Sequence, residues 1–169
     1  MGGRPRDPAI DKAVIAAVVE MLTHDGVVSV PIEAVAERAG VAKTAIYRRW
    51  RTGDALLADA VATFGPRPTS PGGSLRQELL DLLTSLRLLG RLLPVLSLLE
   101  RSGPATAARV AALVEDARGM LRETLSRALA RGELHRYPCE ETLLRLVLAG
   151  VGEPEAALDL LVDGLCGRP

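Results

Sequence analysis

Residues 65–73 constrain the fold more than any other stretch of the chain. They read Gly-Pro-Arg-Pro-Thr-Ser-Pro-Gly-Gly, and three prolines and three glycines in nine positions exclude a continuous helix. We therefore expect a Pro/Gly linker over residues 65–74. It would separate an N-terminal domain, residues 1–64, from a C-terminal domain, residues 75–169.

Both parts of the chain show the apolar spacing of helices. Aromatic residues make up 2% of the sequence, fewer than a sheet-rich fold would normally contain. Apolar residues make up 48% and charged residues 25%, as in a globular protein. The predicted fold class is all-α, with an N-terminal three-helix helix-turn-helix domain joined to a C-terminal helical bundle.

Local signals predict where several helices begin. Asp7 and Pro8 suit the start of the first helix, and Thr52 can cap a helix over about residues 53–64. Ser74 and Gln77 predict a capping box at the start of the C-terminal domain.

Two short predicted helices, residues 32–39 and about 42–50, are separated by a tight turn at Gly40. On the second of them, Ile46 and Trp50 share one side, and Arg48 lies opposite. Five basic residues and no acidic one fall between residues 38 and 51, although the net charge of the chain is zero. This pattern fits a helix that reads DNA, and it fits a solvated amphipathic helix equally well.

Residues 3–62 resemble the N-terminal domain of the TetR family of bacterial transcriptional regulators. The resemblance is clearest in Ile32-Glu33-Ala34-Val35-Ala36-Glu37-Arg38-Ala39-Gly40-Val41, in Ile46-Tyr47-Arg48-Arg49-Trp50 and in Ala55-Leu56-Leu57. It implies an all-helical homodimer whose N-terminal domains bind a palindromic operator in double-stranded DNA. It also implies that the C-terminal domains bind a small-molecule effector that lowers operator affinity.

The resemblance implies DNA contacts at positions in and around the second helix of the motif: Lys43, Thr44, Ala45, Tyr47, Arg48 and Arg49. Three positions depart from the family's pattern. Ala42 replaces a common small polar cap, Thr44-Ala45 inverts a frequent order, and Gly53 stands where a lysine usually contacts phosphate. Arg51 is our candidate substitute for that lysine.

The residues before the first helix include Arg4 and Arg6, on either side of Pro5. Proline keeps this arm extended, so both arginines can enter a minor groove. The alternative is a frayed tail.

The C-terminal domain contains fewer informative motifs. Its last two predicted helices, about 140–148 and 155–166, are short; their apolar residues either form the dimer interface or close the core of the monomer. Arg131-Gly132-Glu133-Leu134 resembles a stretch common in the C-terminal domains of the family. A ligand pocket would be lined by aliphatic side chains, and the same leucines fit a solid core.

The remaining chemistry-bearing residues form no recognisable site. His24 and His135 are isolated, and Cys139 and Cys166 lack metal-ligand spacing, so we expect free thiols and no catalytic centre, metal or cofactor. No apolar run reaches membrane-spanning length and no signal peptide precedes the first helix, so a cytoplasmic location is expected. We predict a ligand-responsive repressor of the TetR type; the alternatives are an activator and a helical protein-interaction module that has lost DNA binding or ligand response.

Overall fold

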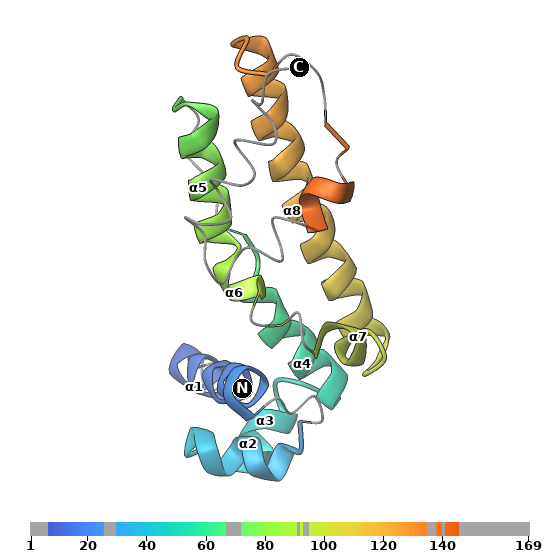
Figure 1. Ribbon diagram of the computed structural model, residues 1–169. Coiled ribbons are helices and arrows are strands. Elements are labelled where there is room, and N and C mark those ends of the chain that lie inside the picture. Colours follow the sequence, from blue (N-terminus) through green and yellow to red (C-terminus); the bar gives the residue numbers. More distant parts are fainter. Residues whose placement is uncertain are drawn as a thin grey trace, which may run out of the picture. The chain divides into compact units, whose positions relative to one another are not determined.

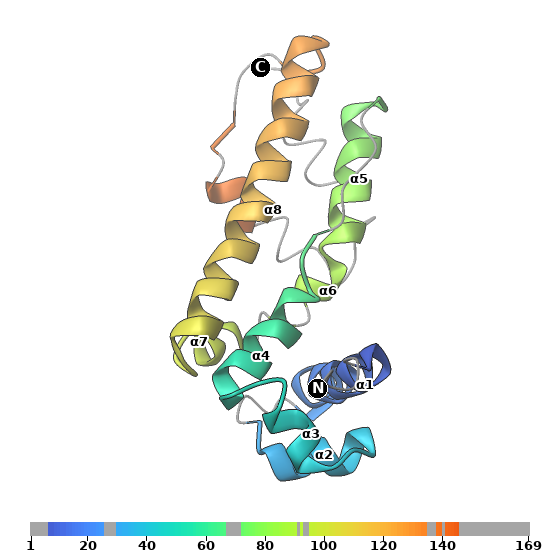
Figure 2. The same ribbon diagram turned by 180° about the vertical axis from the view of Figure 1, so that it is seen from behind.

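The computed structural model describes residues 7–25, 30–66, 72–90, 92, 95–134, 138–139 and 141–145. Over these ranges the regular elements are all helical, which confirms the predicted all-α class (Figures 1 and 2). In chain order they are α1 (Pro8–Glu20), the π-helical turn η1 (Met21–Asp25), α2 (Ile32–Ala39), α3 (Lys43–Tyr47), α4 (Gly53–Ala62), α5 (Leu75–Ser85), α6 (Arg87–Gly90), α7 (Leu96–Leu99) and α8 (Pro104–Ala130).

Several helix ends have the caps that the sequence predicts. The Asp7 carboxylate accepts a hydrogen bond from the N–H of Ala9 at 2.9 Å, and the Thr52 hydroxyl accepts one from Ala55 at 3.1 Å. Gly40 ends α2 with a φ of 65°, a backbone conformation that favours glycine. At Ser74 the hydroxyl accepts from the N–H of Gln77 at 3.3 Å, as the predicted capping box requires, and the side-chain amide nitrogen of Gln77 donates to Asp81 at 3.0 Å.

The chain divides into two compact units. Unit 1 comprises Met1–Thr63 and Pro94–Val110, and unit 2 comprises Phe64–Leu93 and Ala111–Pro169. The first turns of α8 therefore group with the N-terminal helices, an association that glycine and proline positions did not indicate. The predicted linker and domain limits remain predictions.

The core of unit 1 is built from α1, which packs against α2 and α4, with α3 packed on α2. Its fully buried side chains are apolar and include Val14, Val18, Val35, Ile46, Leu56 and Val61. Trp50 is also buried, and its indole N–H donates to Asp59 at 2.8 Å.

Asp54, in the first turn of α4, joins that helix to the start of α8 within unit 1. Its carboxylate accepts hydrogen bonds from the backbone N–H groups of Ala105 and Thr106, each at 2.9 Å, and from the Thr106 hydroxyl at 2.6 Å. A side chain at Gly103 would overlap this carboxylate, so the close approach requires glycine there. Asp54 thus caps a helix that begins some fifty residues further along the chain.

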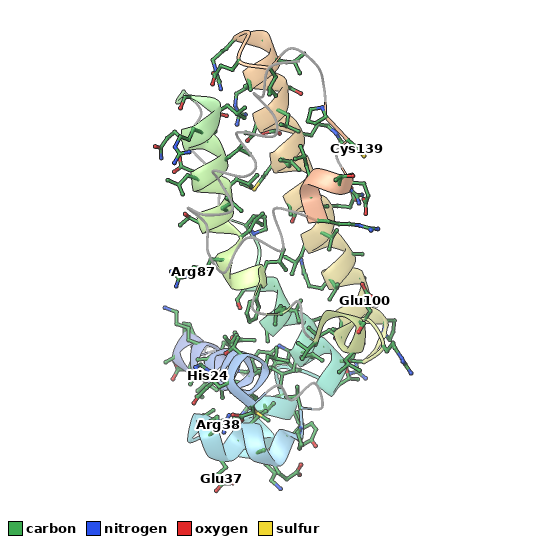
Figure 3. All side chains as sticks on the ribbon, viewed as in Figure 1. His24, Glu37, Arg38, Arg87, Glu100 and Cys139 are labelled. Atoms are coloured by element: carbon green, nitrogen blue, oxygen red, sulfur yellow. The ribbon has the colours of Figure 1, made fainter. Side chains whose placement is uncertain are left out.

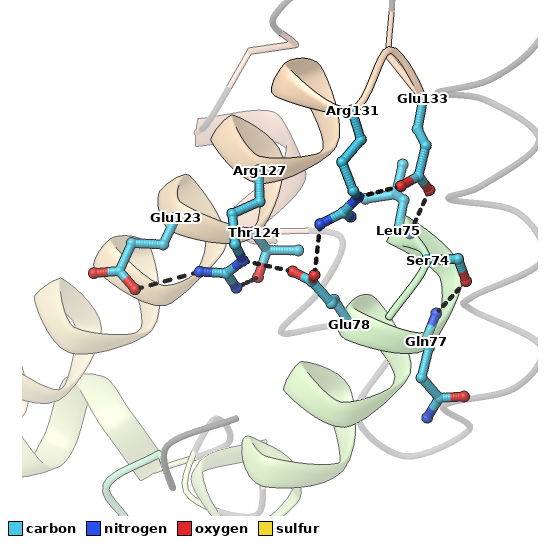
Figure 4. Close-up of polar contacts among 9 residues, drawn as sticks. All are labelled: Ser74, Leu75, Gln77, Glu78, Glu123, Thr124, Arg127, Arg131 and Glu133. Atoms are coloured by element: carbon cyan, nitrogen blue, oxygen red, sulfur yellow. Dashed lines mark hydrogen bonds and ion pairs between the residues drawn. The ribbon is translucent and has the colours of Figure 1, made fainter. Parts of the chain in front are cut away.

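Unit 2 pairs α5 with the part of α8 that follows Val110, and the two helices lie side by side in both views (Figures 1 and 2). The two helices contribute buried leucines to a leucine core, which includes Leu79, Leu82 and Leu83 on α5 and Leu121 and Leu125 on α8. Glu78, 1% exposed, accepts hydrogen bonds from Arg127 at 2.9 Å and from Arg131 at 2.8 Å (Figure 4). A buried carboxylate is therefore held by two guanidinium groups.

The Arg131-Gly132-Glu133-Leu134 stretch closes the same end of unit 2. Glu133 pairs with Arg131 and accepts a hydrogen bond from the N–H of Leu75 at 2.5 Å, at the start of α5 (Figure 4). That backbone hydrogen bond and the arginine hold the pKa of Glu133 below its ordinary value. Gly132, with a φ of 76°, makes the turn that brings Glu133 back. These contacts give residues 131–134 a structural role at the end of unit 2.

Candidate nucleic-acid interface

The turn between α2 and α3 presents one face of α3 outward. The N–H of Val41 bonds to the carbonyl of Ala36 at 3.0 Å, which closes the turn after Gly40. Ile46, 0% exposed, and Trp50 anchor α3 and the turn after it to the core. Away from these anchors, the side chains of Lys43, Thr44 and Tyr47 on α3 and of Arg48, which directly follows it, are exposed.

Three of the five basic residues between Arg38 and Arg51 already hold a carboxylate. Arg38 pairs with Asp25 at 2.8 Å, Lys43 pairs with Glu33 at 2.9 Å, and Arg49 pairs with Asp11. Arg38, labelled in Figure 3, lies on α2, and its partner Asp25 is the last residue of η1. Arg48 and Arg51 are exposed and have no carboxylate partner among the residues that the structure describes.

Arg49 is the most enclosed of these cations, with 9% of its side chain exposed. Besides pairing with Asp11, it donates to the backbone carbonyls of Ala45 at 3.0 Å and Asp7 at 3.2 Å. The guanidinium therefore fastens α3 to the beginning of α1. Its assignment to DNA contact remains a prediction.

Lys43 and Glu33 form the most exposed of the three pairs, with side chains 52% and 63% exposed. The hydrogen bond from Lys43 is the main cause that holds the pKa of Glu33 below its ordinary value. Sequence reasoning missed Glu33, because the run of basic residues was counted from Arg38 and the partner stands five residues earlier. A hydrogen bond between residues ten positions apart has no local signature.

The other candidate residues have different outcomes. Ala45 is half-buried, and Ala42 gives α3 no side-chain cap. A Cβ on Gly53 would lie at an ordinary 3.9 Å from the carbonyl oxygen of Val30, so a Cβ atom fits there. Arg4, Arg6, His135 and Cys166 lie outside the described residues.

Nothing in the described ranges suggests a second kind of site. No group of three or more His, Cys, Asp or Glu side chains in these ranges could hold a metal ion. No helix in these ranges is long and apolar enough to cross a membrane. Cys139 is exposed (labelled in Figure 3). His24 hydrogen-bonds with Thr23 at 3.0 Å. Leu143 and Leu144, two of the residues expected at the dimer interface, are buried within the chain, while the last predicted helix lies outside the described part.

The helical fold and the exposed face of α3 define a helix-turn-helix protein with a second helical unit. Residues 14–60 match the family model for bacterial regulatory proteins of the tetR family. The uncharacterized HTH-type transcriptional regulator YdeS of Bacillus subtilis (strain 168) is 35% identical over 86 residues, which cover 50% of this chain and 43% of that protein. Residues 14–60 are therefore similar to the helix-turn-helix domain of the TetR family.

Solved structures share the fold over nearly the whole chain. A putative TetR-family regulator from Rhodococcus sp. has a TM-score of 0.69 at 19% identity, covering 94% of this chain and 99% of that one. The regulator FadR from Bacillus subtilis, solved in complex with stearoyl-CoA, has a TM-score of 0.67 at 16% identity, covering 90% and 98%. At these identities the likeness shows the fold, and the match to YdeS spans less than half of that relative.

Proposed function

We propose that this protein is a transcriptional repressor that binds a palindromic operator as a homodimer and is released by a small-molecule effector. The observation that carries the proposal is the exposed face of α3, where Lys43, Thr44, Tyr47 and Arg48 stand over the buried anchor Ile46. A major groove admits one such helix, and its first residues reach the base edges. The protein would act without catalysis, in the cytoplasm.

Each exposed residue has a proposed role. Lys43 and Thr44, at the start of α3, meet bases, while the hydroxyl of Tyr47 and the guanidinium groups of Arg48 and Arg51 meet phosphates. Arg49 keeps α3 in place through its bonds to α1. In the dimer, two such helices about 34–36 Å apart would enter successive major grooves.

We propose that the effector binds in unit 2. Its leucine core suits an apolar ligand, and FadR, which shares the fold, was solved with stearoyl-CoA. An effector releases DNA if it binds better to the arrangement that does not fit the operator. Differential affinity for the two states is therefore the quantity to measure.

The test uses fluorescence anisotropy with a DNA duplex taken from upstream of the protein's own gene. The wild type should bind this duplex more tightly than a scrambled one, and Arg48→Ala should weaken binding severalfold. Arg87→Ala removes an exposed arginine of unit 2 and should leave binding unchanged (Figure 3). Equal binding of both duplexes by the wild type would contradict the proposal and favour a helical interaction module.

A further inference from the structure

Glu33 and Lys43 form an ion pair between the two helices of the helix-turn-helix motif. The Glu33 Oε1 atom lies 2.9 Å from Nζ of Lys43, and both side chains are more than half exposed. Lys43 is the first residue of α3, the helix that the proposed function places in the groove. The carboxylate of Glu33 therefore belongs to the same surface.

This pair is poorly suited to phosphate. A phosphate contact gains affinity when a cation displaces condensed counterions, but Glu33 cancels the charge of Lys43. The carboxylate would also repel the DNA backbone at close range. A carboxylate on a DNA-facing surface needs another role.

The pair presents a hydrogen-bond donor beside an acceptor. The Lys43 ammonium retains further N–H donors after its bond to Glu33, and the second carboxylate oxygen of Glu33 can accept. In the major groove, guanine offers the acceptors N7 and O6, and its paired cytosine offers the N4 amino donor. We infer that the Glu33–Lys43 pair reads one G·C base pair in each half-site, with Lys43 donating to guanine and Glu33 accepting from cytosine.

An A·T pair fits the same two groups less well. It places the N6 donor of adenine between its two acceptors, so one lysine cannot bridge both acceptors. Its thymine also adds a methyl group, which would remove water from the carboxylate without replacing the lost hydrogen bonds. The ion pair thus favours G·C, and because it is neutral it adds little to the binding of unrelated DNA.

The experiment selects binding sites for the full-length chain from a random-sequence duplex DNA library. The wild type should enrich a palindrome with a G·C pair at one position of each half-site. Glu33→Ala should lose discrimination there by about 5- to 150-fold, the range for one good base contact. It should also bind scrambled DNA more tightly, with a salt slope steeper by about 0.9 for each domain.

Asp25→Asn is the matched control. Asp25 neutralises Arg38 at 2.8 Å in the same unit, and both side chains are partly exposed, but neither residue lies on α3. This variant should leave the pattern of base preference intact. Glu33→Gln is the second variant, and it should shift the preference at the same position toward adenine, which pairs well with an amide.

The inference rests on the proposed DNA binding, but different results would refute the inference and the proposed function. A wild type that selects no sequence refutes the proposed function. A wild type that selects a palindrome, with Glu33→Ala keeping every base preference while affinity rises uniformly, overturns the role of the pair in readout. Glu33 would then only neutralise the charge of Lys43, without contacting a base.

Discussion

Arg48 and Arg49 are neighbours in the chain, yet their side chains meet different surroundings. Arg48 is exposed and free of carboxylates within the described residues, whereas Arg49 is 9% exposed and bound to Asp11 and two backbone carbonyls. We expect Arg49→Ala to lower the free energy of unfolding by about 1.5–3 kcal/mol, the range for hydrogen bonds to a charged group. Arg48→Ala should weaken DNA binding and leave thermal unfolding unchanged. Circular dichroism melts of both variants check this, and equal melting temperatures would show that Arg49 does not hold α3 in place.

Replacing Gly53 with lysine should add a contact with DNA phosphate. The resemblance to the TetR family implies a lysine contact with phosphate at this position, and a Cβ atom on Gly53 meets no close neighbour. Gly53→Lys should therefore tighten DNA binding at low salt and steepen the salt slope by about two for a dimer, at about 0.9 for each contact. Gly53→Ala is the control for the side chain without the charge. If lysine and alanine bind DNA alike, the N-terminus of α4 lies away from the phosphates.

At the scale of elements, Asp54 joins α4 to the first turn of α8. Burial opposes ionisation of Asp54, but the hydroxyl and N–H of Thr106 and the N–H of Ala105 outweigh it and hold the pKa of Asp54 below its ordinary value. A carboxylate whose pKa falls on folding stabilises the folded state above its unfolded pKa, about 3.9. That stabilisation is lost as the pH drops through the lower, folded pKa.

Asp54→Ala tests this connection. Removing a cap of this kind should cost about 1–2 kcal/mol near neutral pH, and the difference from wild type should shrink as the medium becomes acidic enough to protonate Asp54. Urea unfolding at a series of pH values measures it. Asp116→Asn, at an exposed position of α8, is the control. A difference that stays constant down to strongly acidic pH would mean that the Asp54 charge plays no part.

The network around Glu78 connects α5 with α8. Glu78 is 1% exposed, while Arg127 and Arg131 are about one-third exposed. Glu78→Gln leaves two cations beside a neutral group, and we expect a loss of about 2–4 kcal/mol in the free energy of unfolding, less than for a fully buried pair. Glu123→Gln removes a 74% exposed carboxylate 3.7 Å from the same Arg127 and should cost less than about 0.5 kcal/mol. Similar melting temperatures for the two variants would exclude a structural role for the network.

Across the whole molecule, the features that local chemistry determines were predictable from sequence. Helix starts at Asp7 and Thr52 follow from cap residues that act within three positions. The partners of Asp54 and Arg49 were not predictable, because these contacts join residues about fifty and thirty-eight positions apart. Contacts between distant residues also limited the prediction of the candidate interface. Helical periodicity predicted the exposed face of α3, but only the three-dimensional packing shows which basic residues of the interface are already paired with carboxylates.

That neutralisation sets the salt dependence expected of the whole dimer. With Arg38, Lys43 and Arg49 paired, Arg48 and Arg51 remain for phosphates in each domain, which gives four contacts in a dimer. At about −0.9 for each contact, log affinity should fall against log salt with a slope near −4 once residues 1–6 are deleted. The slope for the full chain should be steeper by about two to four units if Arg4 and Arg6 of both arms lie in minor grooves.

Anisotropy titrations at a series of salt concentrations measure both slopes. Equal slopes would show that the arms do not contact DNA, and a slope near −6 or beyond for the deleted chain would mean that the paired cations exchange their carboxylates for phosphates.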